Sequence, residues 1–172
     1  MRNTNQHLKI AIVTLMAGLY NSGAMAATGS GDASVVISQP IAITAVVDAV
    51  FGSIAAGTAQ SPITISTGNI VSDTGTPGDA VVIDATGAAA FGFSLSGVAG
   101  QAYSLTIDPG SLVGPGAAMA VNVTVPGVLP ALTVAAAPLT FETILTVGAN
   151  QLQGSYSTTG AGTSIAITAN YN

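Results

Sequence analysis

Apolar and polar residues alternate along most of the chain. Between residues 35 and 51 every odd position holds an apolar residue except Gln39. A period of two, rich in β-branched residues, is typical of half-buried β-strands. The same alternation returns in later segments, at residues 91–95, 103–107, 119–125, 139–147 and 165–171. The pattern therefore predicts a chain made mainly of strands.

Glycine and proline separate the alternating segments. Clusters such as residues 75–78, 114–116 and 160–162 are typical of turns. Together the segments predict about nine or ten strands at a spacing of about ten residues. Helix signals are almost absent, because the alanine run at residues 135–137 is short and meets Pro138. Many short strands in one domain indicate an all-β sandwich or barrel.

The start of the chain has the pattern of a secretory signal peptide. Arg2 and Lys9 give it a positive charge. Residues 10–19 are apolar, and residues 24–26 form a small-residue cleavage site. The apolar stretch is too short to cross a bilayer, which takes about 20 residues. We expect residues 1–26 to be removed, and the mature chain to pass through the periplasm to a bacterial cell surface without a membrane span.

The mature chain carries acidic residues without basic ones. The two basic residues and the one histidine lie in the part expected to be removed, all seven acidic residues lie beyond it, and there is no cysteine. Nucleic acids and anionic lipids are bound through Lys and Arg, so both are excluded as partners. Cross-links through Lys or a disulfide are excluded as well. Any assembly of the mature chain is therefore expected to be non-covalent.

The same composition argues against catalysis. A serine nucleophile needs His or Lys as its base, and zinc or copper sites need His or Cys. Paired carboxylates can hydrolyse glycosides, but the chain has no Trp and its mature part has no basic residue to bind a sugar. Asp73 and Asp79 flank a Gly/Pro turn that offers oxygens to calcium, and a plain turn is the simpler interpretation. We expect no enzyme, no cofactor and no metal site.

The sheet edges of this chain lack their usual protection. Natural edges are blunted by charge, especially Lys, whereas the polar positions here are Ser, Thr, Asn and Gly. Residues 27–38 begin with small, flexible residues and continue into an apolar run, which makes Ala33, Val35 and Ile37 the candidate donor strand. Two interpretations stay open. The run is either an ordinary first strand of its own sheet, or a strand added to another copy, which gives a filament when repeated head to tail.

Short motifs along the chain form a recognisable pattern. They lie at residues 40–43, 51–54, 91–97, 145–149, 154–156 and 165–172. This pattern resembles a bacterial secreted β-domain family of unknown function. The chain departs from that pattern in two places, because Leu152 stands one position late and residues 160–162 lengthen the last hairpin.

That family is similar in pattern to the spore-coat-U and archaic chaperone–usher pilin subunits. The resemblance implies an immunoglobulin-like sandwich completed by a strand from a neighbouring subunit. It also implies a periplasmic chaperone or a secretion pore as a further partner. Those subunits usually have a disulfide, which this chain cannot form.

We therefore expect residues 39–172 to fold as an all-β, immunoglobulin-like sandwich of two antiparallel sheets. The expected function is a non-catalytic structural subunit of an extracellular filament, pilus or surface layer. Copies of the chain would join by donor-strand addition, with Ala33, Val35 and Ile37 entering the apolar groove between the sheets of the next copy. The alternative is a monomeric, adhesin-like module that binds a surface through exposed loops.

Overall fold

A computed structural model describes residues 32–172. The signal peptide predicted for residues 1–26, and the start of the segment 27–38, lie outside the described residues. Residues 38–172 form one compact unit, to which residues 32–37 do not belong.

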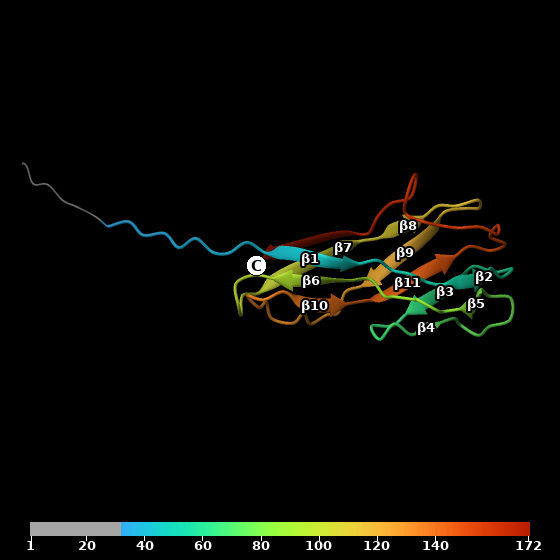
Figure 1. Ribbon diagram of the computed structural model, residues 1–172, viewed down its shortest axis with the longest axis horizontal. Helices are drawn as coiled ribbons and strands as arrows, with labels where there is room; N and C mark the ends of the chain where they lie inside the picture. The colour runs from blue at the N-terminus through green and yellow to red at the C-terminus, as the bar shows by residue number, and fades with distance from the viewer. Residues whose placement is uncertain (1–31) are drawn as a thin grey trace, which may run out of the picture. The chain divides into compact units, whose positions relative to one another are not determined.

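The described part of the chain is all-β, as predicted, with antiparallel pairing and no helix (Figure 1). It has twelve strands: β1 Ala42–Val47, β2 Ser53–Ala55, β3 Ser61–Ile65, β4 Val71–Ser72, β5 Val81–Asp84, β6 Gly92–Ser96, β7 Tyr103–Asp108, β8 Gly110–Leu112, β9 Met119–Thr124, β10 Ala137–Thr140, β11 Glu142–Val147 and β12 Ala166–Tyr171.

The strands form four sheets. The largest has the order β4-β3-β11-β9-β8, and a three-stranded sheet has the order β1-β6-β10. β12 pairs with β7, and β2 pairs with β5. β11 lies at the centre of the largest sheet, where Leu145 is the partner of both Ile63 on β3 and Val121 on β9. The alternation of β11 reflects its two faces, because Thr143, Leu145 and Val147 are buried on one face while the residues between them are less buried.

The first alternating segment gives a shorter strand than its pattern suggests. Residues 32–41 form no strand, and β1 begins only after Pro40. β1 is also irregular, because Ala45 has a positive φ of 49° and the pairing with β6 shifts between Thr44 and Val47. A positive φ breaks the alternation of side chains. Val47 is therefore exposed, although its odd position predicts the buried face.

Two apolar clusters fill the compact unit. The first is surrounded by the largest sheet and by β2 and β5, and its buried members are Phe51, Ile63, Ile65, Ala80, Ala90, Met119, Val121, Leu145 and Val147. The second takes side chains from β6, β7, β10 and β12, and its buried members are Phe91, Phe93, Leu95, Tyr103, Leu132 and Phe141. The Phe93 and Phe141 rings stack in the second cluster with their centroids 5.2 Å apart.

Thr143 is a fully buried polar residue at the start of β11. Its hydroxyl accepts a hydrogen bond from the Phe91 backbone N–H and donates one to the Phe141 carbonyl, each 3.0 Å long. A buried hydroxyl is stable only when it is bonded in this way. The bonds fix residue 91 against the short break between β10 and β11.

Candidate functional site

Four outer strands of the described chain, β10, β8, β4 and β5, are protected against further pairing. Pro138 lies in β10, where it removes a backbone donor from the outer strand of its sheet. β8 is covered by isolated bridges from Ser111 to Thr163 and from Val113 to Ser157. β4 is only two residues long. On β5 the Val82 N–H donates to the Asp73 carboxylate at 3.1 Å. These are the usual ways in which a sheet edge is blocked.

β1 and β12 have none of these protections. Each is six residues long and is the outer strand of its sheet. Neither strand contains a proline or a charged residue. A long, uncharged edge of this kind is a template for pairing with another chain. We therefore call β1 and β12 the open edges of the described domain.

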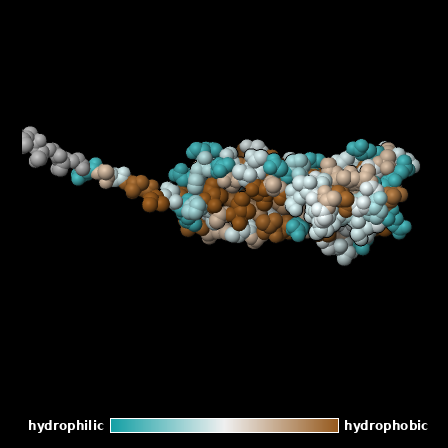
Figure 2. Space-filling view, turned by 90° about the horizontal axis from the view of Figure 1, so that it is seen from above, coloured by the Kyte–Doolittle hydropathy of each residue, from teal (hydrophilic) through white to brown (hydrophobic). Residues whose placement is uncertain are grey.

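The two open edges border the same apolar cluster. Half-buried side chains from just before β1, within β1, and from β7 and β12 pack against the second cluster. They include Ile41, Ile43, Leu105, Ile107, Ile167 and Ala169, which we call the open face. Figure 2 shows a broad apolar area on the part of the domain where these strands lie. A strand that paired with an open edge would cover side chains that are now only half buried.

Tyr171 joins the two open edges at one end. Its hydroxyl donates to the Gln39 carbonyl and accepts the Val98 N–H, each at 2.8 Å. The ring lies against Gly97, where an added Cβ would come 2.7 Å from the Tyr171 hydroxyl oxygen. Glycine at position 97 therefore leaves room for this tyrosine. Through these bonds the end of β12 is held to the backbone that leads into β1.

The candidate donor residues lie in the segment before β1. Val35, Val36 and Ile37 are 83%, 89% and 90% exposed, and Ala33 is exposed as well. Residues 32–41 pair with no strand of the described chain. Large apolar side chains that are this exposed lose the free energy that burial would provide. The structure thus contains both an unpaired apolar segment and an unpaired apolar face.

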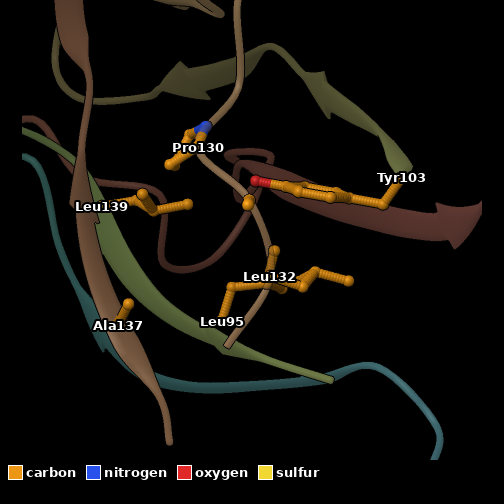
Figure 3. Close-up of a pocket in the computed structure, with 7 residues that line it drawn as sticks. Leu95, Tyr103, Pro130, Leu132, Ala137 and Leu139 are labelled. Atoms are coloured by element: carbon orange, nitrogen blue, oxygen red, sulfur yellow. The ribbon is translucent and has the colours of Figure 1, made fainter. Parts of the chain in front are cut away.

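A small pocket borders the second cluster beside β10 (Figure 3). Leu95, Tyr103, Pro130, Leu132, Ala137 and Leu139 are among its lining residues. Figure 3 shows the Tyr103 ring entering from β7, with its hydroxyl directed toward the segment that carries Pro130. Burial raises the pKa of Tyr103, so this hydroxyl stays protonated at neutral pH. It is the one polar side chain among the lining residues, so the pocket offers no acid–base pair.

The acidic residues do not gather into a site. The turn between Asp73 and Asp79 is tied by its own hydrogen bonds, from Gly75 N–H to Asp73 at 3.0 Å and from the Thr74 hydroxyl to Asp79. Within residues 32–172 no group of three acidic, His or Cys side chains is placed to hold a metal. In the same residues no helix is long and apolar enough to cross a membrane.

No known protein family, curated protein or solved structure matches the chain. The site must therefore be interpreted from its own geometry. The sequence predicts Ala33, Val35 and Ile37 as donor residues, and the structure places them in one exposed segment. It did not find the role of Tyr171, whose partner Gln39 is 132 residues away. Alternation predicts that Tyr171 belongs to a strand but carries no information on such a distant hydrogen bond.

Proposed function

We propose that the protein is a non-catalytic structural subunit that assembles by adding a strand from one copy to the next. Residues 33–37 of one copy would pair with the open edges of another and cover its open face. The observation that carries this proposal is the coexistence, in one chain, of two long unprotected edges around one apolar cluster and an exposed apolar segment. Repeated head to tail, the contact does not close and produces a filament.

The proposal includes a specific architecture. We interpret the sheets β1-β6-β10 and β7-β12 as facing layers of an immunoglobulin-like sandwich that lacks one strand between β1 and β12. Support comes from the second cluster, which takes side chains from both sheets, and from the half-buried state of the open face. A strand from another copy would complete the sandwich and satisfy the free backbone groups of both edges.

Burial of apolar side chains at alternate positions of the donor segment would contribute favourable free energy to assembly. Burial of Val35 and Ile37 would each contribute roughly 1.5–3 kcal/mol before costs. Ordering each donor residue opposes this by about 1–2 kcal/mol. Backbone hydrogen bonds along both edges add to the favourable side. Side chains on a strand alternate between its two faces, so Val35 and Ile37 point into the open face while Val36 points to solvent.

The proposed role as a filament subunit also implies which ligands the protein needs and where it is located. A filament subunit needs no cofactor or metal, and the described acidic residues are engaged in turns or lie singly on the surface. We place the protein outside the cell, at a bacterial surface, with copies of itself as the main partner. A periplasmic chaperone or a secretion pore would protect the open face before assembly.

A pair of single substitutions tests the proposal. Val35→Asp places a charge on the face of the donor that would be buried, and Val36→Asp places the same charge on the opposite face. Mature protein recovered from the cell surface is examined by negative-stain electron microscopy and size-exclusion chromatography. We expect fibres from the unaltered protein and from Val36→Asp, and discrete particles from Val35→Asp. Both residues lie outside the compact unit, so circular dichroism should show the same β content in all three.

Two outcomes would contradict the proposal. Discrete monomers of the unaltered protein at high concentration would favour the alternative of a monomeric surface-binding module. Fibres that survive Val35→Asp as well as Val36→Asp would show that assembly uses another surface.

A further inference from the structure

The donor segment and the face it would cover belong to the same chain. Ile37 and Ala42 are separated by four residues, and loops of four residues connect many β-hairpins. Residues 33–37 are therefore close enough in sequence to fold back onto the β1 edge of their own copy. Within one chain the effective concentration reaches the millimolar range, which favours self-pairing over pairing with another copy. Some feature of the chain must oppose the hairpin if copies are to join.

Pro40 is the first such feature. A proline restricts the preceding residue to extended conformations, so Gln39 is kept out of the helical region that a type I turn requires. Proline is likewise disfavoured at the third position of such a turn. A tight turn with Gln39 and Pro40 at its centre is therefore unfavourable.

Tyr171 opposes a second possible turn, which is centred one residue later, on Pro40 and Ile41. A turn centred on Pro40 and Ile41 would use the Gln39 carbonyl as acceptor for the Ala42 N–H. That carbonyl accepts the Tyr171 hydroxyl at 2.8 Å. A carbonyl oxygen can accept two hydrogen bonds, so the Tyr171 bond opposes the turn by fixing the direction of the carbonyl and not by occupying it. Ile41 is half buried against the second cluster, so a turn at this position would also expose its side chain. The Tyr171 bond at Gln39 and the burial of Ile41 therefore both oppose a turn at residues 39–41.

We propose that Pro40 and Tyr171 form a latch that prevents residues 33–37 from pairing with β1 of their own chain and so reserves this segment for another copy. The inference rests on the proposed function, because it explains how the donor stays available. Gly97 belongs to the latch, since a side chain there would displace the Tyr171 hydroxyl. Tyr171 acts here as a positioning residue that does not itself pair with the donor.

The test compares four proteins: the unaltered mature protein, Tyr171→Phe, the double variant Pro40→Gly/Tyr171→Phe, and Tyr156→Phe as control. The Tyr156 hydroxyl has the same kind of bonding, since it accepts the Gly116 N–H at 2.8 Å and donates to the Leu152 carbonyl at 2.9 Å. Its loss should lower stability to a similar extent without touching residues 39–41. Light scattering measures the monomer and polymer fractions, and hydrogen exchange measures protection of the backbone amides of residues 33–37 in the monomer.

We expect Tyr171→Phe to raise the fraction of self-paired monomer about two- to tenfold, as the loss of the hydrogen bond to the Gln39 carbonyl implies, and the double variant to raise it further. Amides of residues 33–37 should be protected in these monomers. Tyr156→Phe should leave both measurements unchanged.

The latch is overturned if the double variant polymerises like the unaltered protein with unprotected amides, or if Tyr156→Phe shifts the monomer fraction as much as Tyr171→Phe does. Polymer loss without protection of residues 33–37 also overturns it. Failure of the proposed function gives a different result, in which the unaltered protein forms no polymer. In that case there would be no assembly for the latch to control.

Discussion

The two apolar clusters differ in residue type and in how far they are covered, because the buried members are mainly aliphatic in the first cluster and mainly aromatic in the second. The first has nine buried members and seven half-buried neighbours, whereas the second has six buried members and eleven half-buried neighbours. Ile63 and Ile65, in the first, are completely buried. Ile43 and Ile167, in the second, are isoleucines on strands of similar pattern, yet they are only half buried. The isoleucines show that the same residue type is buried to different degrees, so the strands around a side chain decide its burial as well as its type.

Edge protection differs in the same way between the two clusters. Around the first, β8 is covered by bridges and the β5 edge is capped by a carboxylate. Around the second, Pro138 blocks β10, but β1 and β12 stay open. A protein that functions as a monomer is expected to protect all of its sheet edges. Selective protection agrees with a molecule in which one pair of edges serves for binding.

The largest effect is expected when one isoleucine in each cluster is truncated to alanine. Ile63→Ala should lower the free energy of unfolding of the monomer by about 2–5 kcal/mol, because it leaves a cavity among buried side chains. Ile167→Ala should cost only about 1 kcal/mol, since the side chain is half exposed before assembly. Urea denaturation of the monomer measures both. In the polymer the Ile167→Ala cost should increase toward that of Ile63→Ala, and equal costs in the monomer would contradict the comparison.

A second test removes the proline that protects the edge of β10. Pro138→Thr restores a backbone donor to β10 and gives the three-stranded sheet a second open edge. We expect concentration-dependent lateral association, visible as bundled fibres or light scattering, while monomer stability changes by about 0.5 kcal/mol. Pro126→Thr, in an exposed loop, is the control and should stay unbundled. Bundling by both variants would show that loss of any exposed proline suffices, and that β10 is not a protected edge.

The regular strands could be predicted from the sequence because their side chains alternate between core and solvent. The segments predicted at residues 91–95 and 103–107 correspond to β6 and β7. β3 was not among the predicted strands, since it is short, contains Pro62 and precedes a two-residue β4. The left-handed backbone at Ala45 leaves no mark in the alternation.

The candidate site was only half predictable for the same physical reason. The apolar run at Ala33, Val35 and Ile37 is a local pattern, and the sequence contains it in full. The open face and the Tyr171 hydrogen bonds depend on which strands become neighbours in the folded chain. Sequence alternation shows that a strand has a buried face, but not whether its edge is paired.

The smallest expected effect is on the pH dependence of stability. It arises near the first cluster and should leave the second cluster unaffected. Asp84 ends β5, near the first cluster, and its pKa lies below the ordinary value of 3.8 because of hydrogen bonds from the Thr86 side chain and backbone. The Thr86 N–H lies 2.8 Å from the carboxylate. A pKa lowered by folding gives stability that is present above the unfolded value and is lost as pH falls through the folded value. Asp84 is fully exposed, so water screens the effect and it should be slight.

Asp84→Asn should therefore flatten a small part of the stability decrease below about pH 4. Thermal unfolding of the monomer between pH 6 and pH 2 measures it, with Asp48→Asn as a control that removes one carboxylate without altering the Asp84 turn. β1 and β12 contain no carboxylate, so Asp84→Asn should leave the pH dependence of polymer formation unchanged. If Asp84→Asn instead shifts the pH dependence of polymer formation, the region around β5 takes part in assembly, and the separation between a closed cluster and an open one fails.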